Sequence, residues 1–160
     1  GTVTDPERGV GLAPVESRRD TEWCRDLLGR AGLPTADLDD RVVSTSADGR
    51  LTLFLVEADE ERVGCIGIER YGDAALLRSA AIADGSRGQG YGTDAVRSLE
   101  ARAENAGFGT LYLLTTTAAA FFAGLGYEQV EREAVPPSVR CSTEFGELCP
   151  SSATVMRRRL

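Results

Sequence analysis

The stretch RGQGYGTDAVRSLE, from Arg87 to Glu100, places glycines at 88, 90 and 92 directly before a segment with the spacing of an amphipathic helix. A strand-like run ending at Ala83 precedes it. The first N–H groups of a helix lack intrahelical partners and carry partial positive charge from the helix dipole. Glycines let an anion approach such a backbone closely. The stretch therefore predicts a phosphate-binding turn between strand and helix; the alternative is a structural turn that binds nothing.

The spacing of these glycines excludes two familiar phosphate loops. GxxxxGK[ST], the Walker motif, is absent from the chain, and G-x-G-x-G does not match the dinucleotide fingerprint GxGxxG. The pattern that does match is R-x-x-G-x-G, formed by Arg87, Gly90 and Gly92.

Apolar periodicity predicts one α/β domain over residues 1–160. Strand-like apolar patterns, joined first by tight turns and later by helical crossovers, predict strands over Val10–Ala13, Leu51–Glu57, Val63–Glu69, Ala75–Ala83, Thr110–Thr116, Tyr127–Glu133 and Ala153–Arg158. Helical spacing predicts helices over Glu16–Gly32, Pro34–Arg41, Thr93–Asn105 and Ala118–Leu125. The segment 134–152 is predicted to be mostly loop, with one helical turn over Ser142–Leu148.

The composition indicates a cytoplasmic protein that binds neither nucleic acid nor membranes. The chain has 160 residues, a net charge of −7 and a pI near 4.7, which disfavours binding to nucleic acid. It contains no apolar run of the ~18 residues that span a bilayer, and its start lacks the pattern of a secretory signal. All 18 basic residues are arginines. This composition fits a salt-loving organism or, alternatively, a GC-rich genome.

The chain has no histidine and no lysine, which excludes several chemistries. Ser-His-Asp and Cys-His nucleophiles, His-ligated metals, Schiff bases and the kinase lysine are all ruled out. The four cysteines show no CxxC spacing and are expected to be reduced thiols, with Cys24 and Cys65 in the core. We therefore expect no metal site. Proton transfer falls to Asp, Glu, Cys, Tyr, water or the substrate.

The R-x-x-G-x-G motif and the segment AAAFFAGLGYE (Ala118–Glu128), together with the order of elements, resemble the GNAT superfamily of N-acetyltransferases. The resemblance implies a central mixed seven-stranded sheet flanked by about four helices, and acetyl-CoA as acetyl donor. By the same resemblance the loop holds the coenzyme A pyrophosphate, through Arg87, Gly88, Gln89, Gly90, Tyr91, Gly92 and Thr93. The backbone near Ile82 and Ala83 would pair with the pantetheine arm like an added strand.

Four further segments together resemble one branch of the superfamily, the arsenic-resistance N-acetyltransferases. They are LLRSAAIA (76–83), LYLLTTT (111–117), FFAGLGY (121–127) and CSTEFGELCPSSA (141–153). This resemblance implies a small primary amine as acceptor, including amino-acid-like and arsenic-containing amines, while protein N-termini and antibiotics stay open. Dimers are common in the superfamily, so a homodimer is one expectation. Cys141 and Cys149 suggest a weak site for trivalent arsenic or, alternatively, packing beneath the loop.

The catalytic positions depart from the family pattern. Phe122 stands where the family often has a tyrosine that protonates the leaving thiolate, so this role is empty or filled by another tyrosine: Tyr71, Tyr91, Tyr112 or Tyr127. Thr115 stands where the family often has asparagine; its hydroxyl either contacts the pantetheine arm or caps the next helix.

Glu69 is the first candidate for the general base, and Glu144 the second. Glu69 ends the hairpin strand beside the predicted cofactor strand; the alternative is a solvated glutamate at a strand end. Alternation places Leu76, Arg78, Ala80 and Ile82 on one face of the cofactor strand. A buried arginine needs a partner, so Arg78 either pairs with an acid such as Glu69 or binds an anionic group of the acceptor. Without a catalytic base, the chain would be a non-catalytic acyl-CoA-binding or sensing module.

Overall fold

The computed structural model describes residues 10–31, 51–86, 88–140 and 153–160. Seven strands form one sheet in the order β1-β2-β3-β4-β5-β7-β6. Their bounds are β1 Gly11–Pro14, β2 Leu51–Ala58, β3 Glu61–Tyr71, β4 Ala74–Ile82, β5 Thr110–Thr115, β6 Glu128–Gln129 and β7 Thr154–Arg159. Among these strands of the described residues, β4 and β5 are parallel neighbours, and the other neighbouring strands are antiparallel. The predicted mixed seven-stranded sheet is confirmed.

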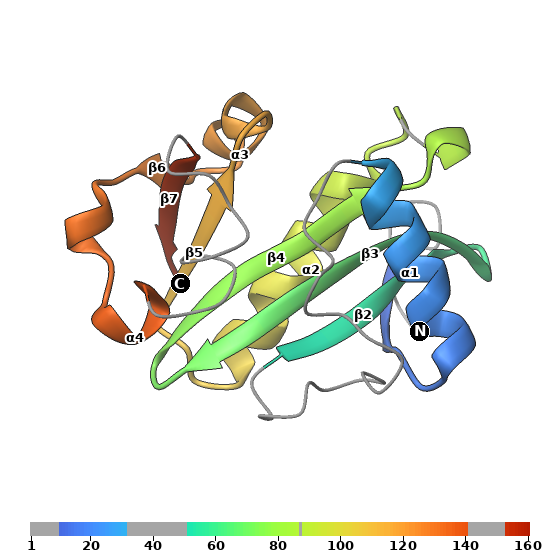
Figure 1. Cartoon of the computed structure of the whole chain (residues 1–160), viewed down its shortest axis with the longest axis horizontal. Coiled ribbons are helices and arrows are strands. Elements are labelled where there is room, and N and C mark those ends of the chain that lie inside the picture. The colour runs from blue at the N-terminus through green and yellow to red at the C-terminus, as the bar shows by residue number, and fades with distance from the viewer. Residues whose placement is uncertain (1–9, 32–50, 87, 141–152) are drawn as a thin grey trace.

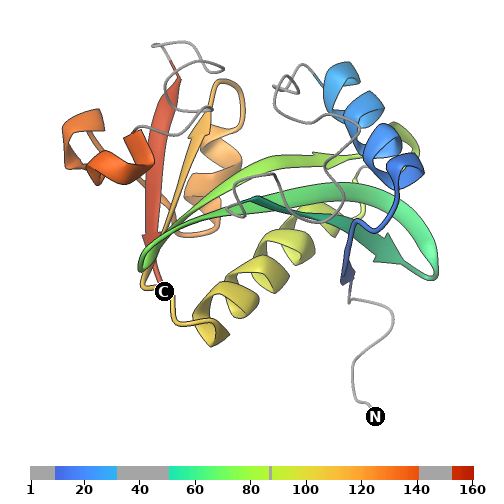
Figure 2. The same cartoon turned by 60° about the horizontal axis from the view of Figure 1, so that its bottom comes forward.

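Helices cover both faces of this sheet (Figures 1 and 2). Within the described residues, the α-helices are α1 Arg18–Arg30, α2 Tyr91–Asn105, α3 Ala119–Gly124 and the single turn α4 Pro137–Arg140. Ser17 is the N-cap residue of α1, and its hydroxyl accepts a hydrogen bond from the Asp20 N–H at 3.1 Å. The predicted helix over Pro34–Arg41 and the predicted helical turn over Ser142–Leu148 lie outside the described residues.

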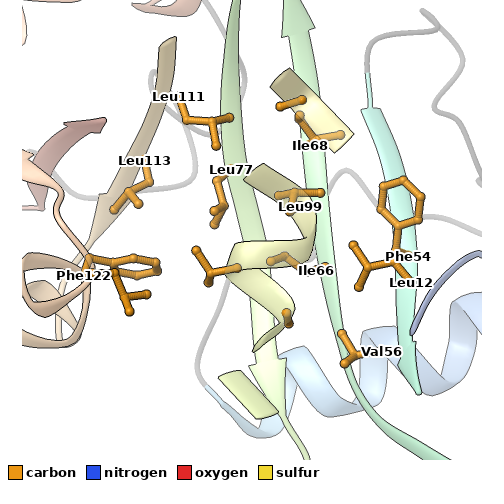
Figure 3. Close-up of a cluster of buried hydrophobic side chains, with 14 of the residues drawn as sticks. Leu12, Phe54, Val56, Ile66, Ile68, Leu77, Leu99, Leu111, Leu113 and Phe122 are labelled. Atoms are coloured by element: carbon orange, nitrogen blue, oxygen red, sulfur yellow. The ribbon is translucent and has the colours of Figure 1, made fainter. Parts of the chain in front are cut away.

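The main hydrophobic core lies between the sheet and α2 (Figure 3). Ala95, Val96, Leu99 and Ala103 are buried on α2 at the spacing that the sequence predicts. They pack against apolar side chains of β2–β5 and against Phe122 of α3. A second cluster, which includes Cys24, Leu28 and Cys65, fills the space between α1 and the opposite sheet face. Burial of this apolar surface is the main force that holds α1 and α2 to the sheet.

Two sequence-based expectations about strands are wrong. The strand predicted over Tyr127–Glu133 is limited to Glu128–Gln129, and a 3₁₀ turn follows at Arg132–Ala134. Glu131, Arg132 and Glu133 offer no apolar face to bury, so nothing holds this run against the sheet. The chain then turns into α4 at Pro137, in the segment predicted as loop; proline suits the first turn of a helix.

The second error concerns the faces of β4. Leu76 packs in the cluster opposite α2, whereas Ala80 packs on the α2 side. Simple alternation had placed both on one face. A β-bulge causes the difference, because the register shifts between Cys65 and Gly67 of β3, so Ile66 faces both Ser79 and Ala80. The extra residue inverts the alternation of β4 after Arg78.

Candidate functional site

The parallel strands β4 and β5 separate after three paired positions. Ala74, Ala75 and Leu76 pair with Thr110, Leu111 and Tyr112. Beyond these pairs β4 continues along β3 as far as Ile82, and β5 continues along β7 as far as Thr115. Figure 1 shows the two strands diverging. Their facing edges therefore leave main-chain groups that can pair with an extended ligand.

The bulge in β4 lies at the start of this divergence. Ser79 has a positive φ of 59°, a conformation that residues other than glycine rarely adopt. Bulges bend the strand that carries them and are frequent next to active sites. Glycine at 64 of β3 is required nearby, since a Cβ there would lie 2.3 Å from the Ala81 carbonyl oxygen.

A cavity of about 940 Å³ occupies the space between the diverging strands. Its walls come from β4 with the bulge, from the first turn of α2, and from the end of β5 with α3. Residues that line it include Cys65, Arg78, Ser79, Ile82, Gly88, Gly90, Tyr91, Gly92, Thr93, Thr115, Phe121 and Phe122. Its size is in the range typical of small-molecule and cofactor sites.

The N-terminus of α2 opens at one wall of this cavity. Gly88 and Gly90 have φ of 82° and 81°, which glycine adopts without strain. Gly90 is the N-cap residue, and among the described residues no side chain caps the helix. The hydrogen bond from the Asp94 N–H to the Gly90 carbonyl, at 3.1 Å, closes the first turn. The N–H groups of residues 91–93 therefore lack intrahelical acceptors, and free N–H groups of this kind can bind an anion.

The cavity brings together most of the residues predicted to hold the cofactor. Ile82, Gly88, Gly90, Tyr91, Gly92, Thr93 and Thr115 all line it. Gln89 is exposed and does not line it, and Arg87 lies outside the described residues. The Ala83 N–H donates to the Val63 carbonyl of β3 at 2.7 Å, so this amide is already paired.

Glu69 and Arg78 form a buried ion pair on the sheet face opposite α2. The Arg78 Nη1 lies 3.1 Å from the Glu69 Oε1, and the Tyr71 hydroxyl donates to the Glu69 Oε2 at 2.8 Å. The pairing expected from the sequence is therefore present. Arg78 lines the cavity, whereas Glu69 is not among its described lining residues. Because both oxygens of Glu69 accept hydrogen bonds, a catalytic role for this carboxylate requires an exchange of partners.

The hydroxyl groups named as candidates occupy different environments. The Thr115 Oγ1 accepts from the Ala118 N–H at 2.9 Å, so it holds the turn before α3. Tyr127 donates to the Glu100 Oε2 at 2.8 Å, and burial together with this carboxylate raises its pKa. Of the four tyrosines, Tyr91 is the one that lines the cavity. Glu144 lies outside the described residues.

Sequence reasoning missed the group around Glu100. This buried carboxylate of α2 accepts from Tyr127, pairs with Arg97 at 2.9 Å and lies 3.6 Å from the Arg158 Nε. Tyr127 also packs edge-on against Phe122, with ring centroids 5.5 Å apart. The group ties α2, which forms one cavity wall, to Phe122 in another. The sequence did contain a signal for this group, because Glu100 stands beside Leu99 and Val96 on the apolar side of α2.

Cys24 and Cys65 are free, buried thiols in the core, as predicted. A hydrogen bond with Cys24, and then burial, raise the pKa of the Cys65 thiol well above its usual value. This thiol also donates to the Ser79 carbonyl, with an S···O distance of 3.4 Å. Cys65 therefore stays protonated at neutral pH. Cys141 and Cys149 lie outside the described residues.

None of the helices in the described ranges is long and apolar enough to cross a membrane.

Comparisons with known proteins agree on one family and fold. The model of the acetyltransferase (GNAT) family matches residues 18–127. The protein YwlB of Bacillus subtilis, itself uncharacterised, is 32% identical over 113 residues, or 68% of this chain and 75% of YwlB.

Among solved structures, N-acetylglutamate synthase from Neisseria gonorrhoeae, in complex with coenzyme A and N-acetylglutamate, matches 94% of this chain with a TM-score of 0.74 at 18% identity. This chain spans only 35% of that enzyme. Rv2747 from Mycobacterium tuberculosis, solved with CoA, gives a TM-score of 0.73 at 19% identity, covering 94% of this chain and 98% of Rv2747. At these identities the structures establish the fold.

Proposed function

Because this chain belongs to the GNAT family of acetyltransferases, we propose that it transfers the acetyl group of acetyl-CoA directly to the primary amine of a small molecule. The observation that carries the proposal is the cavity between β4 and β5, which opens onto the uncapped N-terminus of α2. One continuous site thus offers a strand edge and an anion-binding turn.

The residues of this cavity fit the chemistry of coenzyme A. Its pyrophosphate is an anion, which the N–H groups of residues 91–93 and the helix dipole would hold. Its pantetheine arm carries amide groups, which would pair with the free edge of β4 as an added strand does. Gly92 has no Cβ, and one there would lie 3.6 Å from Phe121 and 3.8 Å from Ile82. Larger side chains at position 92 would narrow the cleft at this point.

Direct transfer suits the groups in the cavity better than an acyl-enzyme. The neutral amine attacks the thioester carbon, a C–N bond forms, the C–S bond breaks, and CoA leaves as the thiolate. The amine proton passes to a carboxylate or to water. Cys65 is the described thiol in the cavity wall, and its raised pKa makes it a poor nucleophile.

Arg78 supports an acceptor with a carboxylate or another anionic group. Arg78 is the charged residue of β4 that lines the cavity. Its guanidinium is buried against Glu69, and an acceptor carboxylate would take the place of Glu69, since an arginine binds a carboxylate in a bidentate manner. An amino-acid-like amine would carry such a group beside its reacting nitrogen. The N-acetylglutamate in the gonococcal enzyme is a product of this chemical kind. Three expectations from the sequence stay predictions: membership of the arsenic-resistance branch, adaptation of the source organism to high salt, and a homodimer.

A non-catalytic acyl-CoA-binding or sensing module is the second candidate. Phe122 supports it, because phenylalanine supplies no proton where the family often has tyrosine. The hydrogen bonds that Glu69 accepts on both of its oxygens support it as well. Such a module would bind acetyl-CoA in the same cleft and transfer nothing.

An acceptor screen that follows the release of free CoA from acetyl-CoA separates the two candidates. The acceptors are amino acids, their carboxyl amides and the corresponding simple amines, tested at low and high salt. We expect release that depends on the acceptor and is faster for free amino acids than for their amides. If no acceptor causes release of CoA, despite tight binding of acetyl-CoA, the sensing module is favoured. Equal rates for acids and amides would reject Arg78 as a carboxylate partner.

A further inference from the structure

Ser79 combines backbone strain with a position in the wall of the proposed donor cleft. Its φ of 59° is one that glycine would adopt without strain, yet the chain has a residue with a hydroxyl there. Strained residues persist where surrounding structure holds them, and they gather at functional sites. Ser79 is 6% exposed and lines the cavity where β4 leaves β5. This combination suggests that the Ser79 hydroxyl itself has a role in the cleft.

Hydrogen bonds hold both the side chain and the main chain of Ser79 in place. Its hydroxyl oxygen accepts from the Arg78 Nε at 3.0 Å, and its carbonyl accepts from the Cys65 thiol. Arg78 is fixed in turn by Glu69, and Glu69 by Tyr71. The Ser79 hydroxyl is thus preorganised by a chain of buried partners.

The proton of this hydroxyl is available for a ligand. A serine hydroxyl accepts and also donates, and none of the described residues accepts from Ser79. A hydroxyl that accepts a bond from a cation becomes a stronger donor, since hydrogen bonds in a chain polarise one another. Two other wall residues at catalytic positions of the family lack this arrangement: Phe122 has no donor, and the Thr115 hydroxyl accepts from the neutral Ala118 N–H and not from a cation.

We propose that the Ser79 hydroxyl donates a hydrogen bond to the acetyl oxygen of the bound thioester and stabilises the negative charge that develops there. The inference rests on the proposed function. As the amine adds to the carbonyl carbon, the carbonyl π electrons move to this oxygen. They return as the C–S bond breaks, so Ser79 keeps its proton throughout. Arg78 acts through Ser79 as a positioning residue, and Ser79 is the residue that touches the reacting atoms.

Acetyl-CoA labelled with ¹³C at the carbonyl tests this role without turnover. Infrared difference spectra of the bound thioester would be recorded for the wild type, Ser79→Gly and Ser79→Ala. Both variants lack the hydroxyl, but only alanine keeps a Cβ in the strained conformation. Ser98→Ala on α2, outside the cavity lining, serves as the control. Titration of CoA confirms that each variant folds and keeps the cleft.

A hydrogen bond lowers the carbonyl stretching frequency. We expect this lowering in the wild type and in Ser98→Ala, and its loss in both Ser79 variants. The affinity for CoA should be unchanged, and kcat should fall roughly 100-fold in the Ser79 variants, as when one oxyanion donor is removed. An equal frequency in all four proteins would overturn the role of Ser79 while leaving the donor cleft intact. Absence of acetyl-CoA binding to the wild type would overturn the proposed function and this inference together.

Discussion

Replacing Glu69 by glutamine removes one charge from an ion pair that water barely reaches. The Arg78 side chain is 0% exposed and the Glu69 side chain is 8% exposed. An arginine left in this position without its counter-charge keeps the desolvation cost and loses the attraction that offset it. Breaking such a pair from one side costs about 3–5 kcal/mol. Glutamine keeps one acceptor oxygen for Arg78, and its NH₂ group can donate to the Tyr71 hydroxyl, so we expect the lower part of this range.

The size of the effect can be compared within the same chain. Glu128 pairs with Arg157 at a similar distance, 2.9 Å, but its side chain is 61% exposed. Glu128→Gln should cost less than about 1 kcal/mol, because water and salt screen an exposed pair. For a chain of this length, a loss of about 3–5 kcal/mol corresponds to a fall in Tm of roughly 6–20 °C, and we expect the lower part of this span for Glu69→Gln.

Urea and thermal unfolding of the two single variants give the comparison. The double variant Glu69→Gln with Arg78→Met adds a further test. Removing both partners of a buried pair is less damaging than removing one, so it should be more stable than Glu69→Gln alone. The reasoning is refuted if Glu69→Gln costs no more than Glu128→Gln, or if the double variant is the least stable of the set.

Two further predictions concern the neighbouring structure. Gly64→Ala places a Cβ 2.3 Å from the Ala81 carbonyl oxygen, so β3 and β4 must separate; urea unfolding should show a loss of about 1–3 kcal/mol, and calorimetry a weaker affinity for acetyl-CoA. If Gly64→Ala is as stable as the wild type, β3 and β4 do not approach each other as closely as this at Gly64. Burial and Glu100 raise the pKa of Tyr127 above its ordinary value of 10.0, so the folded state keeps a proton that the unfolded chain releases above about pH 10. Its contribution to stability is therefore complete below about pH 10 and is lost as the pH rises further; Tyr127→Phe should flatten this alkaline decline in urea unfolding, and an unchanged slope would contradict the assignment.

Local patterns predicted most of the fold because most of its elements bury one regular face. The spacing of Ala95, Val96, Leu99 and Ala103 predicts α2, and the packing of that face confirms it. The glycines before α2 predicted an open helix N-terminus, and Gly88 and Gly90 do adopt the left-handed conformations that such a turn uses. These features depend on residues close together in the sequence.

The features that shape the cleft depend on pairing between strands, which local patterns do not encode. The bulge at Ser79 follows from the register of β4 against β3, and it inverted the expected faces of Ala80 and Ile82. The hydrogen bond between Ser79 and Arg78 was therefore not foreseen. The Glu69–Arg78 pair was foreseen because a buried arginine needs a counter-charge and the hairpin offers one nearby.

The most direct test of the donor cleft is calorimetric titration of acetyl-CoA into the wild type, Gly90→Asp and Gly72→Asp. Both glycines have positive φ and open space around them, but Gly72 lies in the turn between β3 and β4 and not in the cleft. A carboxylate at position 90 would repel the pyrophosphate by about 4 kcal/mol at 4 Å and an effective dielectric constant of 20. The account predicts similar binding by the wild type and Gly72→Asp, and at least roughly 100-fold weaker binding by Gly90→Asp. Equal affinity in all three proteins, or no binding to the wild type, would contradict it.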